Sequence, residues 1–405
     1  MIFALVLMWW HLQRAVTCID CNGKCWTAHP HLWRLGLLLV LFALGFGARC
    51  YYWLTGAGFV TDTVPMILSF VWMIMVMWFC TVALAMDAWN CGVVIIQALR
   101  HKLDAKQLCR GLASPRCIAF CASAFTLIAL LSGLYTTRHP RIVYQDFSSA
   151  LVPKDADGYR MLLISDLHLK QEHYPEVILD AVERAIASEK PDVIVHAGDF
   201  IDGPWSRDVS KYTARIAQWS APDGKFASFG NHDGYSGWEV SAAWHERAGF
   251  TLLGQRCGIA SAAPQPWLFL AASDDESVWG AWRYGEARAK LSLAERRKQH
   301  EEIRARVENL PAVGTKQLGV LLRHQPKLPQ TLAPEYKMML SGHTHGGQVF
   351  PFNFVVYATY GLRTGVPQLA RNVWIYICRG TGFWGPPLRF LEPPEIVIIT
   401  FHPEQ

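Results

Sequence analysis

The sequence has 405 residues, of which 51% are hydrophobic and 18% charged, and it contains 17 tryptophans. This length allows two or three structural units, and the many apolar residues exclude a disordered or collagen-like chain. The formal net charge of +5 comes entirely from residues 1–135, which hold nine basic residues against four aspartates. The remaining residues are neutral overall, which argues against a groove for a nucleic-acid backbone. No nucleic-acid partner is therefore expected.

Long apolar runs in the first third of the chain predict membrane-spanning helices. Val64–Met86 runs for 23 residues without a charge, and Cys117–Tyr135 runs for 19. Because about 20 apolar residues in a helix cross the hydrocarbon core, both runs are long enough to span it. A third span is expected at Leu32–Leu54. Met1–Val16 is marginal as a span, and Ala88–Leu99 is expected to be a separate helix at the membrane interface.

Basic residues flank these runs unevenly. Residues 11–34 and 87–116 contain lysines and arginines, whereas residues 55–63 contain none. The positive-inside rule then places the two basic segments in the cytoplasm and the chain after Tyr135 on the exoplasmic side. We therefore expect a multi-pass protein of the inner or plasma membrane, with the rest of the chain on the exoplasmic (periplasmic) side.

The last two-thirds of the chain alternates short apolar runs with helix-like stretches, which predicts an α/β fold. Predicted helices cover Glu176–Ser188 and Leu291–Asn309. The runs that predict buried strands are Met161–Ser165, Asp192–His196, Lys225–Phe229, Trp267–Ala272, Gly319–Leu322, Met338–Leu340, Trp374–Ile377 and Ile396–Phe401.

Aspartate, asparagine and histidine residues, whose side chains can bind a metal ion, follow five of these strands. They are Asp166, His168, Asp199, Asn231, His232, His324, His343 and His345. Asp166 and His168 form a D-x-H pair, which places a carboxylate and an imidazole on the same side of an extended chain, where both can bind one ion. Any one of these residues alone would be read as a turn or cap residue. Five such coincidences at strand ends instead indicate a metal site.

The ordered set D-x-H, GD, GNH[DE], H and GHTH resembles the signature of the calcineurin-like metallophosphoesterase superfamily, over about residues 158–401. The form GHTHGGQ at Gly342–Gln348 resembles membrane-anchored bacterial enzymes and transmembrane proteins with a metallophosphoesterase domain. The resemblance implies a four-layer α-β-β-α sandwich with a dinuclear metal centre at the edge of two facing sheets. We expect residues 1–136 to form a transmembrane region of three or four helices, residues 137–157 a linker, and residues 158–401 the catalytic domain.

The resemblance also implies a role for each motif residue. Asp199 would bridge two metal ions and belong to the catalytic machinery, and His232 would act on the phosphate without binding metal, held by Asp233 or a backbone group. The implied ligands are Asp166, His168 and His345 for the first ion, and Asn231, His324 and His343 for the second.

Two divalent ions are the implied cofactors. Nitrogen and oxygen ligands without thiolate suit Mn²⁺, which we favour, and also Fe or Zn²⁺. Arg323 and Arg379 are candidates for contacts with the substrate phosphate, although surface salt bridges explain them equally well. Cys18, Cys21 and Cys25 form a C-x2-C-x3-C cluster without a fourth ligand at a set spacing, so loop thiols are favoured over a metal site.

The function expected from these features is a membrane-anchored, metal-dependent phosphoesterase that hydrolyses phosphodiester or pyrophosphate bonds. The Gly382–Leu391 loop carries Phe383, Trp384, Leu388 and Phe390, which could rest on the bilayer and favour a lipid-linked substrate. Related enzymes cleave nucleotide–lipids such as UDP-2,3-diacylglucosamine. That substrate is cytosolic, which conflicts with the exoplasmic placement, so one of the two expectations must be wrong.

Two alternatives stay open from the sequence. The first is a tethered phosphodiesterase or phosphatase for soluble substrates. The second, less favoured, is a membrane transporter or sensor with a structural metal site, because the three main spans carry ionisable residues only at or near their ends. The sequence makes no prediction of oligomeric state.

Overall fold

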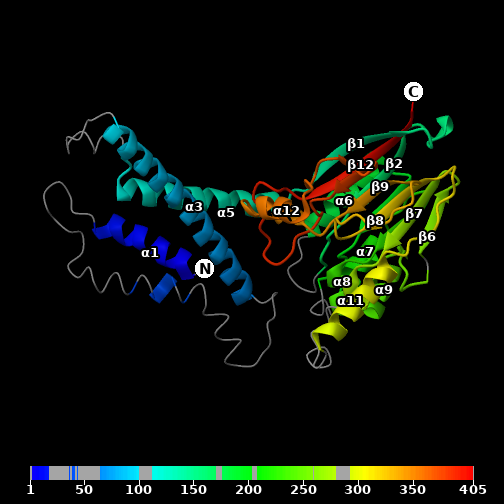
Figure 1. Cartoon of the computed structure of the whole chain (residues 1–405), viewed down its shortest axis with the longest axis horizontal. Helices are drawn as coiled ribbons and strands as arrows, with labels where there is room; N and C mark the ends of the chain where they lie inside the picture. The colour runs from blue at the N-terminus through cyan, green and yellow to red at the C-terminus, as the bar shows by residue number, and fades with distance from the viewer. Residues whose placement is uncertain are drawn as a thin grey trace. The chain divides into compact units, whose positions relative to one another are not determined.

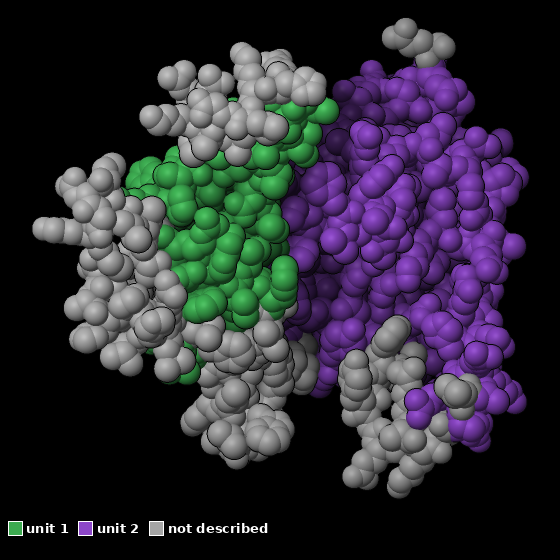
Figure 2. Space-filling model, turned by 60° about the vertical axis from the view of Figure 1, so that its left-hand side comes forward, with its two compact units in different colours: residues 1–132 green, residues 133–405 purple. Residues whose placement is uncertain are grey.

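A computed structural model describes residues 2–17, 36, 39–41, 43, 64–99, 112–169, 176–202, 208–258, 260–279 and 292–404. The chain divides into two compact units, residues 1–132 and residues 133–405 (Figure 2). The cysteine cluster at Cys18, Cys21 and Cys25 lies outside the described residues, as does nearly all of the expected span Leu32–Leu54.

The described residues of the N-terminal part are mainly helical, with α1 (Ile2–Thr17), α3 (Val64–Leu99) and α5 (Pro115–Thr137). By length and composition, two described helices could cross a membrane: Ile67–Leu99 within α3, and α5. These two match the predicted spans at Val64–Met86 and Cys117–Tyr135. The structure supports neither the further spans nor the exoplasmic placement, which stay predictions.

The expected break at Ala88 is wrong. α3 is one continuous helix of 36 residues, so Ala88–Leu99 extends the spanning helix and is not a separate interfacial one. A helix of this length measures about 54 Å, well beyond the hydrocarbon core of about 30 Å. The composition changes from apolar to mixed after Met86, but this change does not end the helix, because no proline interrupts the i→i−4 hydrogen bonds there.

The second unit is built from twelve strands and several helices among the described residues. The strands are β1 (Arg141–Ser149), β2 (Tyr159–Ile164), β3 (Val193–Ala197), β4 (Lys225–Ser228), β5 (Thr251–Leu252), β6 (Ser261–Gln265), β7 (Leu268–Ser273), β8 (Leu318–Arg323), β9 (Tyr336–Ser341), β10 (Gln368–Ala370), β11 (Val373–Ile377) and β12 (Glu395–Pro403). The α-helices are α6 (Glu176–Glu189), α7 (Ser210–Ile216), α8 (Asn231–Ser236), α9 (Trp238–Arg247), α11 (Leu293–Val307) and α12 (Phe352–Tyr360). Short 3-10 turns are η1 (Lys154–Ala156), η3 (Glu276–Trp279) and η4 (His345–Gly347).

These strands form two six-stranded sheets that face each other (Figure 1). The first has the order β1-β12-β2-β3-β4-β5, and the second β10-β11-β9-β8-β7-β6. Strands β2 to β5 are parallel, as are β7, β8, β9 and β11, while β12 runs antiparallel to β2. Parallel neighbours end at the same edge of a sheet, so the loops after β2, β3 and β4 gather at one edge, as do those after β8 and β9.

The main core lies between the sheets. Met161 and Leu163 of β2 point inward and pack with Val320 of β8 and Leu340 of β9 in one buried cluster. The alternate residue Leu162 points outward and joins a second cluster with Leu179 of α6. Because both faces of these strands are buried, their sequences are continuously apolar, which made them visible as strands.

The helices and the outer clusters complete the layers. The outer face of the first sheet is covered by α6, α7 and α9, which contribute Ile178, Ile216 and Trp244 to its cluster. A further cluster covers the outer face of the second sheet and contains Leu321, Met339 and residues of the flanking loops. The predicted α/β fold, with two facing sheets flanked by helices and preceded by apolar helices, is confirmed.

Each of the eight predicted strands is present, and Glu176–Ser188 and Leu291–Asn309 correspond to α6 and α11. One segment differs from expectation. Residues 141–149, assigned to a linker, form β1, which pairs in parallel with β12 along its whole length. Its mixed polar sequence, with several exposed residues, is that of an edge strand, which lacks the apolar run that marks a central one. The remaining domain boundaries stay predictions.

Candidate metal centre

The loops after β2, β3, β4, β8 and β9 bring the eight polar residues of the sequence motifs together. Six of them form two groups of potential metal ligands: Asp166, His168 and His345 in one, and Asp199, His324 and His343 in the other. A third group joins His168 to His232 and Asp202. The ligand atoms within each group lie within 4.8 Å of one another. Asn231 adjoins the second group, with its Oδ1 2.8 Å from His343 Nδ1.

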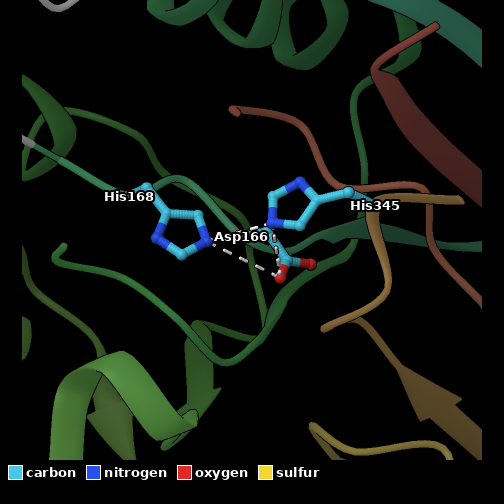
Figure 3. A group of neighbouring side chains, drawn as sticks. All are labelled: Asp166, His168 and His345. Carbon is cyan, nitrogen blue, oxygen red and sulfur yellow. Dashed lines mark hydrogen bonds and ion pairs between the residues drawn. The ribbon is translucent and has the colours of Figure 1, made fainter. Parts of the chain in front are cut away.

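The first group is held between the ends of β2 and β9 (Figure 3). The Nε2 atoms of His168 and His345 lie 3.1 Å apart and 4.0 and 3.5 Å from Asp166 Oδ1. All three side chains are buried. Asp166 also accepts the backbone N–H of His343 at 2.9 Å, which ties the two strand ends together.

Asp199 lies between the two groups. Its Oδ2 is 3.0 Å from His324 Nε2 in the second group and 3.5 Å from His168 Nε2 in the first. Its Oδ1 accepts the backbone N–H of His232 at 2.8 Å. A carboxylate placed in this way is positioned to bridge two ions, which is the role expected for it from the sequence.

Five of these ligand residues have a left-handed backbone. The φ angles are 52° at Asp166, 48° at His168, 57° at Asp199, 72° at His343 and 49° at His345. Residues with a side chain rarely adopt this conformation, and where they do the surrounding structure must hold them there. The turn after each strand thereby directs its side chain toward the common centre and away from the continuation of the strand.

Two glycines make this convergence possible. Gly198 has φ 87°, and a Cβ on it would lie 2.6 Å from His324 Nδ1. A Cβ on Gly230 would overlap the Asp199 carboxylate. Glycine is needed at both positions because the chain passes directly against a ligand.

The orientation of His324 tests whether the site fits a cation. Its Nδ1 lies 2.7 Å from the Ala197 carbonyl oxygen, which can only accept, so Nδ1 carries the hydrogen. In the neutral ring, Nε2 then presents a lone pair to the Asp199 carboxylate, and it has no hydrogen-bond partner among the described residues. Two facing lone pairs require a positive charge between them or a proton on the ring. A divalent ion bound by nitrogen and oxygen donors supplies that charge, so these residues fit the metals that the motifs imply.

The electrostatics of the site also favour bound cations. Burial disfavours the charged form of His324, but Asp199 and Asp166 outweigh burial and raise the pKa of His324 to about 10. Burial and the charge on His324 lower the pKa of His343 to about 3. Burial and the nearby Arg389 hold the pKa of His345 well below its usual range. The last two imidazoles are therefore neutral, which is the form that binds a metal.

Asp202 is a functional residue that the sequence reasoning missed. Its Oδ1 lies 3.0 Å from His168 Nδ1 and 2.9 Å from His232 Nδ1, and its side chain is buried. Burial acts to lower the pKa of His232, but the Asp199 and Asp202 carboxylates prevail and raise it. Asp202 follows Gly198-Asp199 by three residues, so a wider reading of that motif would have found it.

The expected support of His232 by Asp233 is wrong. The Asp233 carboxylate accepts the backbone N–H groups of Gly230 at 2.8 Å and Phe200 at 3.2 Å, and the Ser241 hydroxyl at 2.8 Å. It therefore joins the loops after β3 and β4, and its oxygens are already occupied. Asp202 takes the position beside His232 instead.

Arg389 contacts His345 of the first ligand group, and the sequence did not predict this role either. Its side chain is fully buried, and Nη2 lies 2.8 Å from His345 Nδ1. The same guanidinium donates to the carbonyl oxygens of Arg379 at 2.7 Å and Gly382 at 2.5 Å. Because a guanidinium only donates, His345 must accept at Nδ1, so in the neutral ring Nε2 carries the hydrogen and faces Asp166 and His168. An ion bound at Nε2 would have to displace that hydrogen.

A cavity of about 460 Å³ opens at the two ligand groups. His232, Gln348, Phe352 and Trp384 line it together with five of the seven proposed ligands, which are His168, Asp199, Asn231, His343 and His345. The described lining residues include no lysine or arginine, so any positive charge offered to a phosphate there would come from bound ions and protonated imidazole.

The two arginines proposed as phosphate contacts lie elsewhere. The Arg379 guanidinium is 3.0 Å from Glu392 and 2.7 Å from Glu395, so two carboxylates already neutralise it. Arg323 is largely buried and lines a separate small pocket with Asp274 and Asp275. The geometry favours structural roles for both.

The Gly382–Leu391 loop also differs from expectation. Of the four side chains expected to face the bilayer, Phe383, Leu388 and Phe390 are buried in the protein, and Trp384 is exposed, at 44%. Their aromatic and aliphatic side chains pack against the rest of the domain, so they cannot together rest on a membrane.

Comparison with known proteins agrees with this site. The family model of the calcineurin-like phosphoesterases matches residues 159–347. An uncharacterized metallophosphoesterase of Aquifex aeolicus is 29% identical over 67% of this chain and 97% of its own length. The uncharacterized metallophosphoesterase YkuE of Bacillus subtilis is 30% identical over 62% of this chain and 82% of its own length. A transmembrane protein with metallophosphoesterase domain from Danio rerio is 26% identical over 69% of this chain and 61% of its own length.

The chain therefore belongs to the calcineurin-like phosphoesterase family. It carries a metal-dependent phosphoesterase domain, and the resemblance inferred from its motifs is confirmed. The named relatives do not define a substrate.

Replacing Arg389 tests its control of the His345 ring. In the full-length chain, Arg389→Met removes the donor that keeps the hydrogen on Nε2, and it removes a positive charge beside the site. We therefore expect binding at the first ion site to strengthen by about 10- to 100-fold, the usual size of the effect of a partner of a metal-bound histidine. Arg389→Lys keeps the charge without the planar fork and should have an intermediate effect. Mn²⁺ affinity is measured by competition with a chelator dye.

The matched control is Arg297→Met on the exposed face of α11, which should leave affinity unchanged. Unaltered Mn²⁺ binding by a folded Arg389→Met variant would show that Arg389 serves packing alone.

Proposed function

We propose that the protein is a membrane-anchored phosphodiesterase with two divalent metal ions, and that its substrate is a lipid-linked phosphodiester or pyrophosphate. The observation that carries the proposal is the position of Asp199 between two groups of buried or half-buried ligands that share one cavity. One carboxylate serving both groups favours a pair of ions acting on one phosphate over two unrelated structural sites.

Bound ions would supply a clamp for two phosphate oxygens and lower the pKa of a water molecule between them. The chain itself provides the proton. His232 lines the cavity, lies in a third group of potential ligands with His168 and Asp202, and has its pKa raised by Asp199 and Asp202. It is therefore suited to protonate the leaving oxygen, with Asp202 holding Nδ1 so that Nε2 can face the substrate.

The chemistry of the donors restricts the metal. All seven proposed ligands offer nitrogen or oxygen, which suits Mn²⁺, Fe and Zn²⁺. We propose Mn²⁺ as the working ion.

Support for a lipid-linked substrate comes from the surroundings of the cavity. Trp384 and Phe352 line it, and both are partly exposed, at 44% and 42%. The helix α5 is apolar and long enough to cross a membrane, and it leads directly into the domain, with β1 beginning four residues after it. We propose that α3 and α5 anchor the enzyme, and that the catalytic domain lies on the exoplasmic side, as the distribution of basic residues predicts.

Substitution of Asp199 and His232 tests the catalytic proposal. With Mn²⁺ and bis(p-nitrophenyl) phosphate, we expect His232→Ala in the full-length chain to lower kcat by about 10²- to 10⁴-fold, the usual contribution of a general acid. Asp199→Asn removes the shared charge, so it should abolish turnover and reduce the bound metal. His300→Ala and Asp155→Asn, both at exposed positions, are the matched controls. Full turnover by Asp199→Asn would refute the bridging role.

The pH dependence tests Asp202. A general acid must be protonated, so kcat falls as pH rises through the pKa of His232. Because Asp202 raises that pKa, Asp202→Asn should move the alkaline limb of the kcat profile to lower pH. Asp155→Asn should leave the profile in place. An alkaline limb that does not move in Asp202→Asn would mean that another group donates the proton.

A further inference from the structure

The helix α12 has a surface unlike that of the domain's other exposed helices. Its nine residues, Phe-Asn-Phe-Val-Val-Tyr-Ala-Thr-Tyr, include no charged side chain, and none of them is buried. Phe354 is 63% exposed and Val355 58%. By contrast, the exposed helix α11 is composed mainly of charged residues. A helix that is apolar on its exposed side is suited to an apolar environment.

This helix forms part of the rim of the metal cavity. It begins five residues after η4, which contains the ligand His345, and Phe352 lines the cavity itself. Val349 forms bridges to Phe390 and Leu391, and Leu391 is 64% exposed. We call the exposed apolar residues in this region the rim patch; it consists of Phe352, Phe354, Val355, Tyr357, Trp384 and Leu391.

The rim patch is connected to the end of the apolar helix α5. The backbone N–H of Arg389 donates to the carbonyl oxygen of Gly133 in the last turns of α5, at 3.1 Å. Gly133 also packs closely on Leu388, because a Cβ there would lie 2.6 Å from the Leu388 side chain. The Gln348 side-chain amide makes two hydrogen bonds to the backbone of Trp384. Its Nε2 donates to the carbonyl oxygen at 2.8 Å, and its Oε1 accepts the N–H at 2.9 Å. The loop that holds the end of α5 therefore also holds the rim.

We propose that the rim patch lies in the interfacial layer of the bilayer that α5 enters, so that the metal cavity opens at the membrane surface. Three features favour lipid over a protein partner. The loop that carries Trp384 and Leu391 contacts the end of a membrane-length helix through Leu388 and Arg389. It contains tryptophan and tyrosine, which are enriched at the membrane interface, and the exposed Arg363 follows α12, where it can meet lipid phosphates. The docking surface rests on these observations, and its consequence for catalysis rests on the proposed function.

The consequence is a route for the substrate. A lipid whose acyl chains stay in the bilayer could present its phosphate to the cavity without leaving the membrane, because Phe352 and Trp384 belong both to the rim patch and to the cavity lining. A soluble diester would reach the same ligands from water and would not depend on the patch.

Photo-crosslinking in a bilayer tests the docking surface without reference to activity. The full-length chain carries benzoylphenylalanine at the position of Val355 and is reconstituted in nanodiscs of phosphatidylcholine and phosphatidylglycerol. The matched control carries it at the position of Val240, which is 49% exposed. Val240 belongs to α9, a helix that lies away from α12 (Figure 1). Mass spectrometry should find phospholipid adducts at 355 and not at 240. Crosslinks from 355 to a second copy, or to residues 1–132, would overturn the proposal.

An activity measurement tests the consequence. Val355→Glu places a charge on the rim patch without altering the cavity lining, and it should lower hydrolysis of a phospholipid diester in the same nanodiscs by about tenfold. Hydrolysis of bis(p-nitrophenyl) phosphate should stay unchanged, as should both reactions in Val240→Glu. Equal rates on the lipid for Val355→Glu and wild type would contradict the docking role. Absence of hydrolysis of either diester by wild type would instead refute the proposed function, and the crosslinking result would still stand.

Discussion

Two buried carboxylates, those of Asp166 and Asp199, impose the constraint on which the site depends. Charged groups removed from water are costly unless opposite charge or hydrogen bonds compensate them. Here a backbone N–H group donates a hydrogen bond to each carboxylate, and imidazole rings lie next to the carboxylate oxygens. The raised pKa of His324 expresses the same need for positive charge at the centre. Two divalent ions would meet that need and make this buried polar group stable as well as reactive.

The two sheets hold this arrangement in place. Each ligand follows a strand whose two faces are buried, so the strand end cannot shift without disturbing the core. That rigidity maintains the left-handed backbone of five ligand residues, a conformation that costs about 1–3 kcal/mol for each residue. Glycines at 198 and 230 remove the side chains that would block the approach. The stability of the fold thus holds the ligand residues in a strained backbone conformation. That conformation directs their side chains toward the common centre.

The sequence identified six residues that the structure brings together as potential metal ligands, because each lies in a short motif directly after an apolar run. Asp202 and Arg389 were harder to predict, since their partners are distant: Arg389 contacts a histidine 44 residues away. β1 was missed because an edge strand is only partly apolar. The Gly382–Leu391 aromatics were misjudged because composition does not distinguish a buried loop from one that faces lipid, and the exposed apolar surface proved to lie mainly on α12.

The central claim is that one centre holds two ions that share Asp199. The most direct measurement is to load the full-length, metal-free chain with Mn²⁺, determine the bound metal and record its electron paramagnetic resonance spectrum. Ions bridged by a carboxylate lie roughly 3.5–4 Å apart in two-metal sites, so we expect two Mn²⁺ per chain with an exchange-coupled spectrum. A single ion per chain, or two ions with the spectrum of isolated Mn²⁺, would contradict the account.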